Sequence, residues 1–209
     1  GVSPQIASWE EMFDINVKGA LKIVKVAQEL DIKRIIHAGS FHEYGKSSKK
    51  YNKIPSDAPL EPLTQYAISK ATSFHLLNYY AKHENLELVY ARIFSAYGLG
   101  QNSKNFWPSL RQAALNNKDF HMTSGQQIRD FIQVKKVAEY LVKACERNDV
   151  ISGKPLIINV GTGKGKSLLE FASEQWRNFN ASGKLIPGSI EQRSDPDSFI
   201  ADISNLEEY

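Results

Sequence analysis

The chain has 209 residues, of which 42% are hydrophobic and 23% are charged, and its formal net charge is +3. These values are typical of a globular protein with one sizeable domain or slightly more. So small and evenly spread a charge gives no reason to expect nucleic-acid binding, and no run of about 18 apolar residues suggests a membrane span. The single cysteine, Cys145, cannot form an internal disulfide, which favours a reducing cytoplasm, and we expect it to pack inside a helix.

Apolar runs that suit strands alternate with apolar-periodic segments that suit helices, which predicts an α/β fold built on a parallel sheet. Ser8-Trp9-Glu10-Glu11 has the spacing of a capping box and predicts a helix start, and Ser167 is expected to cap a later helix. In chain order, the expected elements are a helix over 9–30, a strand over 34–38, a loop over 46–63, a helix over 65–83, a strand over 86–93, a helix over 108–116, a short strand through 131, a helix over 134–146, a strand over 156–160 and a helix over 168–179.

The most informative stretch runs from Ser40 to Lys70. Tyr66 and Lys70 stand four residues apart in an expected helix, so they share one face. An ammonium group beside a phenol favours the ionised phenol, and we therefore expect Lys70 to make Tyr66 a usable acid or base. Ser40 would lie at the carboxyl edge of the sheet and hold a substrate oxygen against Tyr66. Taken alone, the Tyr-x-x-x-Lys spacing equally suits an exposed helical pair, worth about 0.2–0.5 kcal/mol.

Six motifs stand in a fixed order over nearly the whole chain. They are Asn16-Val17-Lys18-Gly19-Ala20, Gly39-Ser40 with Tyr44-Gly45, Tyr66 with Lys70, Arg92-Ile93-Phe94-Ser95-Ala96-Tyr97-Gly98, Arg129-Asp130-Phe131-Ile132-Gln133-Val134, and Asn159-Val160-Gly161-Thr162-Gly163. This ordered set resembles the extended short-chain dehydrogenase/reductase family, particularly its NAD(P)-dependent nucleotide-sugar epimerases and dehydratases. The resemblance implies a partial Rossmann-like parallel sheet flanked by helices. Residues 1–150 would be the C-terminal half of a dinucleotide-binding domain, and residues 151–209 part of a small substrate-binding region.

The resemblance also implies a proton-transfer site made by a serine, a tyrosine and a lysine. Tyr66 would exchange a proton with a sugar hydroxyl while hydride moves to or from the nicotinamide. Lys70 would lower the pKa of Tyr66 and bind the nicotinamide ribose, and Ser40 would bind the reacting oxygen. Asn16 matches a position near the cofactor, although an asparagine inside a helix is equally consistent with a structural role.

Substrate contacts are implied at three further positions. Arg129 and Arg193 match arginines that meet the nucleotide diphosphate, with a surface pair between Arg129 and Asp130 as the alternative. Ser95 stands where many family members have asparagine, so its contact with substrate would differ. Sugar dehydratases carry Asp-Glu directly after the serine or threonine, whereas this chain has His42 in that region, which disfavours 4,6-dehydration. His42 is either an alternative acid/base or a structural histidine.

Two glycine patterns bear on the cofactor. Family members begin with a Gly-x-x-Gly-x-x-Gly turn that receives the cofactor pyrophosphate at a helix N-terminus, and this sequence contains no such turn. We therefore expect a fragment that binds NAD or NADP poorly by itself. The segment 161–167, Gly-Thr-Gly-Lys-Gly-Lys-Ser, resembles a triphosphate-binding loop but is one residue short, so we expect a structural turn.

Two functions stay open at this point. The chain is either a fragment of an epimerase or 4-keto reductase that acts on a nucleotide-diphosphate sugar, or a non-catalytic dimerising or ligand-binding module derived from the same family. The helices over 9–30 and 65–83, which pair subunits in family members, would form a homodimer in both cases. No metal site is expected.

Overall fold

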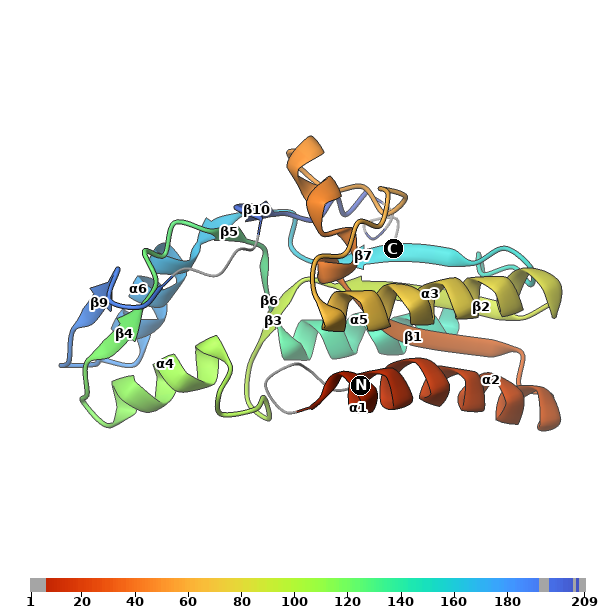
Figure 1. Ribbon diagram of the computed structural model, residues 1–209, viewed down its shortest axis with the longest axis horizontal. Helices are drawn as coiled ribbons and strands as arrows, with labels where there is room; N and C mark the ends of the chain where they lie inside the picture. Colours follow the sequence, from red (N-terminus) through yellow and green to blue (C-terminus); the bar gives the residue numbers. More distant parts are fainter. Residues whose placement is uncertain (1–6, 192–195, 205, 207–209) are drawn as a thin grey trace.

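The structure is a computed structural model of the chain and describes residues 7–191, 196–204 and 206. The molecule is elongated, with the main sheet and its helices at one end and a smaller group of helices and short strands at the other (Figure 1). Within the described residues, no helix is both long enough and apolar enough to cross a membrane. The α/β class expected from the sequence is confirmed.

A three-stranded parallel sheet forms the main part of the fold. Its strands lie in the order β1 (Arg34–Ser40), β2 (Glu87–Ile93) and β7 (Leu156–Val160). Ser40 pairs with Ile93, and Ile93 pairs with Val160, so the carboxyl ends of all three strands meet at one edge. This edge is where open α/β sheets place their ligands.

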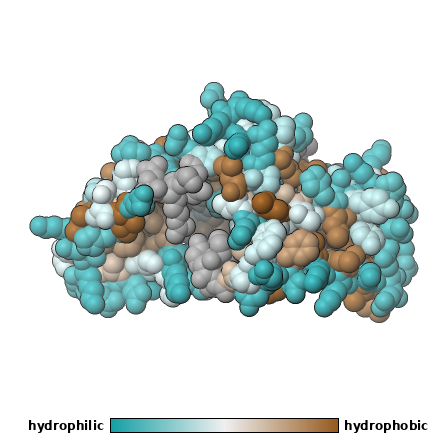
Figure 2. Space-filling view, viewed as in Figure 1, coloured by the Kyte–Doolittle hydropathy of each residue, from teal (hydrophilic) through white to brown (hydrophobic). Residues whose placement is uncertain are grey.

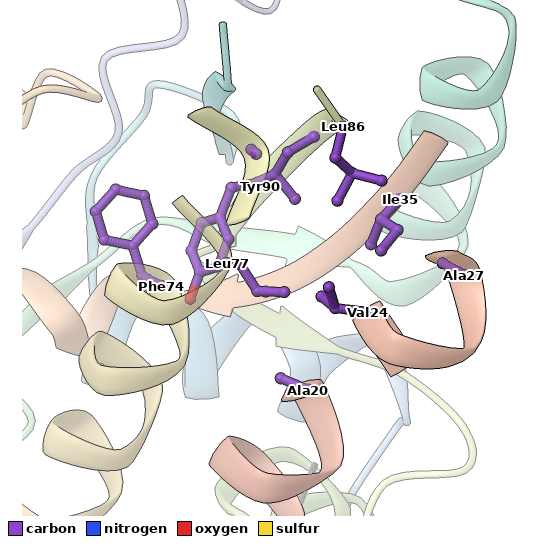
Figure 3. Close-up of a cluster of buried hydrophobic side chains, with 10 residues drawn as sticks. Ala20, Val24, Ala27, Ile35, Phe74, Leu77, Leu86 and Tyr90 are labelled. Carbon is purple, nitrogen blue, oxygen red and sulfur yellow. The ribbon is translucent and has the colours of Figure 1, made fainter. Parts of the chain in front are cut away.

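Helices cover both faces of the main sheet. α2 (Gly19–Glu29) and α3 (Gln65–His83) pack on one face, and α5 (Val134–Glu146) packs on the other. Figure 3 shows the first interface, whose labelled side chains are Ala20, Val24, Ala27, Ile35, Phe74, Leu77, Leu86 and Tyr90. Residues of β2 alternate between the two interfaces, so this strand is apolar along most of its length, as a strand buried on both faces must be.

The N-terminal helical run begins with the capping box expected from the sequence. The Ser8 side chain accepts a hydrogen bond from Glu11 N, and the Glu11 carboxylate accepts one from Ser8 N at 2.7 Å. The run continues through α1 (Trp9–Phe13) and the π-helical segment η1 (Asp14–Lys18) into α2. Its extent agrees with the helix predicted over 9–30. The π-helical segment is new, because apolar periodicity does not distinguish a single wider turn from an α-helical one.

A second apolar cluster forms at the other end of the molecule (Figure 1). It is built from α4 (Phe106–Leu115), β4 (Phe120–Met122), α6 (Leu168–Asn178) and β9 (Leu185–Pro187). The cluster takes two elements from before residue 150, while the main sheet takes β7 from after it. A boundary at residue 150 therefore does not separate the two groups.

Short strands join the two groups. The pairs are β3 (Ser95–Tyr97) with β6 (Phe131–Gln133), and β5 (Ile128–Arg129) with both β8 (Lys166–Ser167) and β10 (Ser198–Phe199). The loop expected over 46–63 starts with a 3-10 turn, η3 (Lys46–Lys50). The helices expected over 65–83 and 134–146 are confirmed by α3 and α5.

Two local predictions in the later helices have opposite outcomes. Ser167 caps α6 as expected, and it does so in a capping box with Glu170. The prediction that Cys145 packs inside its helix is wrong, because its side chain is exposed. In α5 the neighbouring Ala144 takes the buried position instead, so Cys145 falls on the outer side of the helix.

Candidate active site

Ser40 is the last residue of β1, at the carboxyl edge of the main sheet. The chain turns there into a single 3-10 turn, η2 (Phe41–Tyr44). The Ser40 hydroxyl accepts a hydrogen bond from His42 N at 3.3 Å, and Glu43 Oε1 accepts one from Ser40 N at 2.7 Å. This second capping box holds a buried serine at the place where a ligand is expected, which agrees with the sequence prediction for its position.

Tyr66 enters the same region from the first turn of α3, which Thr64 caps by accepting a hydrogen bond from Ala67 N at 3.2 Å. The Tyr66 phenol lies next to the Ser40 hydroxyl. Burial raises the pKa of Tyr66, the hydrogen bond to Ser40 lowers it, and the negative charge of Glu43 raises it; the net direction is upward. Ser40 and Tyr66 therefore lie together as predicted, but the phenol is held in its protonated form.

Lys70 lies one helical turn after Tyr66 and is buried, with 8% of its surface exposed. Its ammonium donates a hydrogen bond to Ala38 O in β1 at 2.9 Å. Burial lowers the pKa of Lys70, and the charge of Glu43 raises it. The net direction at Tyr66 is set by burial, and the Lys70 ammonium is directed to a backbone carbonyl, so the expected lowering of the Tyr66 pKa by Lys70 stays a prediction.

His42 lies beside the phenol. Its ring stacks on Phe41 with centroids 4.1 Å apart and meets the Tyr66 ring edge-on at 5.9 Å. Phe199 from β10 completes this aromatic group, with its ring 6.1 Å from that of His42. A histidine in this position can reach a ligand held against Tyr66, which keeps the acid/base role for His42 open.

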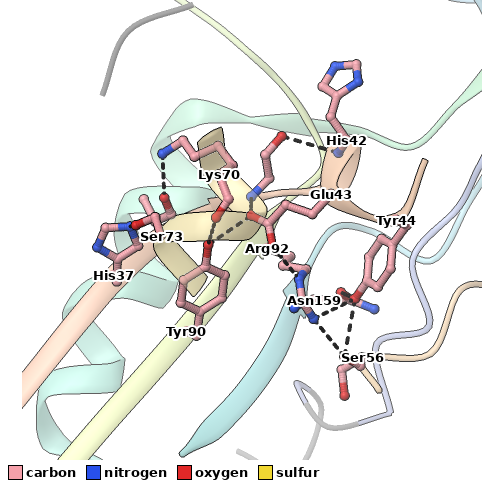
Figure 4. Close-up of polar contacts among 12 residues, drawn as sticks. His37, His42, Glu43, Tyr44, Ser56, Lys70, Ser73, Tyr90, Arg92 and Asn159 are labelled. Carbon is pink, nitrogen blue, oxygen red and sulfur yellow. Dashed lines mark hydrogen bonds and ion pairs between the residues drawn. The ribbon is translucent and has the colours of Figure 1, made fainter. Parts of the chain in front are cut away.

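A buried polar network lies next to Ser40, and sequence reasoning missed it (Figure 4). Arg92 Nε donates to Glu43 Oε2 at 2.8 Å, and both side chains are almost fully buried, with 2% and 0% exposed. Arg92 also donates to Ser56 O at 2.8 Å, and the Tyr44 hydroxyl donates to Asn159 Oδ1 at 2.5 Å. A signal was available, since an arginine inside an otherwise apolar strand requires a buried partner.

Asn16 lies in the π-helical segment and is buried, with 4% of its surface exposed. Its amide donates to Ser69 Oγ at 2.9 Å, and Ser69 Oγ in turn donates to Tyr66 O at 2.8 Å. The contact joins η1 to the part of α3 that carries Tyr66 and Lys70. Asn16 thus supports the helix of the site, and its predicted contact with a cofactor stays a prediction.

Arg129 is buried in β5, with 6% of its surface exposed. Its Nη1 donates to Ile128 O at 2.8 Å and to Pro196 O at 3.2 Å, and its guanidinium lies 5.1 Å from the centroid of the Phe199 ring. The alternative of a surface pair with Asp130 is wrong, because both residues are buried. Phe199 contacts both Arg129 and His42, so the arginine is connected to the site through one aromatic ring.

The other two candidate substrate residues are less informative. Ser95 opens β3, and its backbone N donates to Asp130 O at 2.9 Å. Arg193 lies outside the described residues. The substrate contacts expected for these two residues stay predictions.

The glycine-rich segment after β7 is a structural turn, as predicted. The carboxylate of Asp130, the residue after β5, binds the backbone of this turn. It accepts hydrogen bonds from Thr162 N at 2.8 Å and Gly163 N at 2.9 Å, and a third from Ala201 N at 3.2 Å. A carboxylate of the chain itself therefore uses the backbone donors that a phosphate would need. A side chain at Gly161 would come within 2.7 Å of Asp130 Oδ2, so the segment must approach Asp130 closely.

The described residues can be compared with the parts of a nicotinamide cofactor. Tyr66 and Lys70 suit the hydroxyls of the nicotinamide ribose, because an ammonium has three donors and Lys70 uses one of them to bind Ala38 O. The pyrophosphate has no comparable cradle in the glycine-rich segment, because Asp130 occupies its donors. In the part of the chain that the structure describes, no cluster of three or more His, Cys, Asp or Glu side chains could hold a metal.

Comparison with known proteins places these features in a family. The profile of the NAD-dependent epimerase/dehydratase family matches residues 1–161 of the chain. The UDP-glucose 4-epimerase of Halalkalibacterium halodurans is 29% identical over 212 residues, covering 91% of this chain and 61% of that protein. The chain thus spans less than two thirds of the length of this relative.

Two solved structures share the fold. The UDP-glucose 4-epimerase of Thermotoga maritima, solved with UDP-glucose, has a TM-score of 0.86 at 18% identity and covers 99% of this chain and 68% of its own. MoeE5, solved with UDP-glucuronic acid and NAD, has a TM-score of 0.85 at 24% identity and covers 98% and 67%. The Rossmann-like fold and the profile match agree, and the chain belongs to the NAD-dependent epimerase/dehydratase family.

Proposed function

We propose that this chain carries the proton-transfer site of an NAD(P)-dependent nucleotide-sugar epimerase or 4-keto reductase, formed by Ser40, Tyr66 and Lys70. The observation that carries the proposal is the placement of Ser40 at the end of β1, at the carboxyl edge of the parallel sheet, with the Tyr66 phenol next to it and Lys70 one helical turn later. A buried serine and a partly buried tyrosine, set where α/β folds bind ligands, are suited to holding one oxygen atom of a substrate between them.

Each residue has a distinct part in this proposal. Tyr66 gives a proton to the sugar oxygen or takes one from it, while Ser40 orients that oxygen. Lys70 keeps its bond to Ala38 O and uses its two remaining donors on the nicotinamide ribose. The cofactor supplies the hydride chemistry when bound, and the protein supplies position and charge.

The direction of the pKa shift at Tyr66 bears on the reaction. Burial raises the pKa of this phenol, so it is protonated at neutral pH. A protonated phenol is ready to donate to a carbonyl oxygen as that carbonyl is reduced. The free chain is thus set for the reductive step, which a 4-keto reductase performs as its whole reaction and an epimerase performs as its second half.

The substrate class in this proposal is a nucleotide-diphosphate sugar. The relatives described above include UDP-glucose 4-epimerases and structures that hold UDP-glucose or UDP-glucuronic acid. Arg129, Ser95 and Arg193 are the proposed substrate contacts. We also propose a cytoplasmic location. The planar fork of donors in the Arg129 guanidinium has the geometry that suits phosphate oxygens.

The experiment that tests the proposal is calorimetric titration of the chain with NAD and with NADP, followed by turnover assays with UDP-sugars and their 4-keto forms. Tyr66→Phe should lower turnover by about 10²–10⁴-fold, because one positioned acid/base contributes that much. Tyr79→Phe is the matched control, since Tyr79 lies on the same helix with an exposed side chain. Equal and measurable turnover of the Tyr66 variant and the control would refute the proposal.

A homodimer belongs to both functions, the catalytic fragment and the non-catalytic dimerising module, and the exposed side chains of the two helices suit it. Ile23 and Val26 of α2 and its C-cap Leu30 are exposed, with 57%, 49% and 65% of their surfaces accessible, and α3 exposes Ile68 and Tyr79. Figure 2 shows apolar surface at the end of the molecule where α2 lies. A homodimer through these helices predicts that Leu30→Lys lowers the mass measured by light scattering, with Leu99→Lys, an exposed loop position, as the control.

A further inference from the structure

We propose that Glu43 is a positioning residue of the site: its carboxylate, anchored by Arg92, fixes Ser40 where the serine hydroxyl meets the Tyr66 phenol. The inference rests on the proton-transfer site proposed above and adds to it a residue that does not touch the reacting atoms. Glu43 would act through Ser40, and Arg92 would act through Glu43.

The contacts of Glu43 account for both of its carboxylate oxygens. Oε1 accepts hydrogen bonds from Ser40 N at 2.7 Å and from the Tyr90 hydroxyl at 2.9 Å, while Oε2 accepts from Arg92 Nε at 2.8 Å. The side chain has no exposed surface. A carboxylate buried this deeply is stable only when its partners are fixed, so its position is determined by the side chains around it.

The bond to Ser40 N acts at the point where β1 ends. Ser40 is still extended, and the chain reverses into η2 directly after it. A strand end followed by a single short turn has few backbone bonds of its own. The reciprocal bonds between Ser40 and the turn, from Ser40 N to Glu43 and from His42 N to the Ser40 hydroxyl, close that turn on itself. The direction of the Ser40 hydroxyl therefore depends on where the Glu43 carboxylate is held.

Arg92 holds the carboxylate from the neighbouring strand. It lies in β2, and besides Glu43 it donates to Ser56 O at 2.8 Å and to the Tyr44 hydroxyl at 3.3 Å. Tyr44 in turn reaches Asn159 in β7. The network thus ties the end of β1 to both other strands of the sheet, as Figure 4 shows.

The same carboxylate reaches the helix that carries the other half of the site. The Tyr90 hydroxyl lies between Glu43 Oε1 and Lys70 O, at 2.9 Å and 3.2 Å (Figure 4). Charged and titratable groups around Glu43 are Arg92 and Tyr90 on β2, Tyr44 beside it on η2, and Tyr66 and Lys70 on α3. Glu43 is therefore in contact with β1 and, through one hydroxyl, with α3.

A titration of Tyr66 reports whether the Ser40 hydroxyl is held beside the phenol, and it does not require catalysis. A difluorotyrosine placed at position 66 ionises at lower pH than tyrosine, and its ¹⁹F resonance reports that ionisation. In the otherwise wild-type chain, Ser40→Ala should raise the pKa of this phenol, because a neighbouring hydroxyl can donate a hydrogen bond to the phenolate and stabilise it. If Glu43 positions Ser40, this effect of Ser40→Ala on the pKa should disappear when Glu43 is changed.

The decisive background is Glu43→Met with Arg92→Met, which removes the carboxylate and its cation together so that no buried charge is left unpaired. In this background, Ser40→Ala should leave the pKa of the phenol unchanged, because without the Glu43 carboxylate the Ser40 hydroxyl is no longer held beside the Tyr66 phenol. The control background is Arg34→Met with Glu87→Met, an ion pair at 2.7 Å between the same two strands at their other end. In that background, Ser40→Ala should raise the pKa as in the wild type.

An equal effect of Ser40→Ala in the two double-Met backgrounds would overturn the proposal. Should the Glu43→Met, Arg92→Met chain fail to fold by circular dichroism, Glu43→Asp decides instead. This variant keeps the charge beside Arg92 but shortens the reach to Ser40 N, and it should likewise abolish the effect of Ser40→Ala. The titration uses no substrate or cofactor, so its result is independent of the turnover assay that tests the proposed function.

Discussion

Arg92 Nε lies 2.8 Å from Glu43 Oε2, and the ion pair that they form is closed off from water at the carboxyl ends of β1 and β2. At the opposite ends of the same two strands, Arg34 and Glu87 form a second pair at 2.7 Å, with 24% of each side chain exposed. The two pairs have the same chemistry and nearly the same length. They differ in burial, and burial determines what the loss of one partner costs.

Arg92→Met should lower the free energy of unfolding by about 3–5 kcal/mol, because it leaves the Glu43 carboxylate buried without its cation. Arg34→Met should lower it by about 1 kcal/mol or less, since water can reach Glu87 and replace the lost partner. Urea denaturation of both variants at neutral pH measures the difference. Equal losses would contradict the prediction that burial sets the cost of losing a partner.

His37 should make the chain less stable as the pH falls from about 6.5 to about 4. Its ring is stacked on Tyr90 at 5.3 Å, and burial, with a further contribution from the charge of Lys70, lowers its pKa from 6.5 to about 4. Between these two values the unfolded chain binds the proton and the folded chain does not, so acid favours unfolding. The loss amounts to about 3 kcal/mol at full extent.

The measurement for His37 is the free energy of unfolding at pH 7 and at pH 4.5, compared between the wild type and His37→Phe. The variant keeps a ring against Tyr90 and cannot take up a proton, so its stability should fall less with acid. His83→Gln, at an exposed position of α3, is the control and should behave as the wild type does. An identical pH dependence in all three chains would contradict the prediction.

Ser167→Ala should destabilise the chain by about 0.5–2 kcal/mol, because it removes the side chain that accepts from Glu170 N at 3.1 Å and caps α6. The measurement is the melting temperature of Ser167→Ala compared with that of Ser103→Ala, a change of the same type at an exposed loop position, so that the difference is the contribution of the cap. The same melting temperature for the two variants would show that α6 does not depend on its cap.

Gly161→Ala and Gly19→Ala should have effects of opposite sign. A Cβ at Gly161 would lie 2.7 Å from both Ala201 Cβ and Asp130 Oδ2, so we expect a loss of about 1–3 kcal/mol. A Cβ at Gly19 would lie no closer than 3.8 Å to Asp14 O, and alanine within a helix should add about 0.5–1 kcal/mol. Chemical denaturation of both variants tests the contrast, which would fail if the two changes shifted stability in the same direction.

The sequence by itself determined which segments become helices and strands, because periodicity and caps act over a few residues. The Ser8 and Ser167 caps, α3, α5 and β7 all follow from such local patterns. It also determined that Ser40 ends a strand and that Tyr66 begins a helix, so their meeting at the sheet edge was predictable from the order of elements in a parallel α/β fold.

Only the tertiary structure decided how charge is distributed around those residues. Lys70 turns to Ala38 O, Asp130 fills the glycine-rich segment, and Arg129 is buried, although nothing near them in the sequence requires it. The ion pair of Glu43 and Arg92 joins residues 49 positions apart. A pKa or a buried ion pair depends on every neighbour within a few ångströms, and those neighbours come from distant parts of the chain that meet only when it folds.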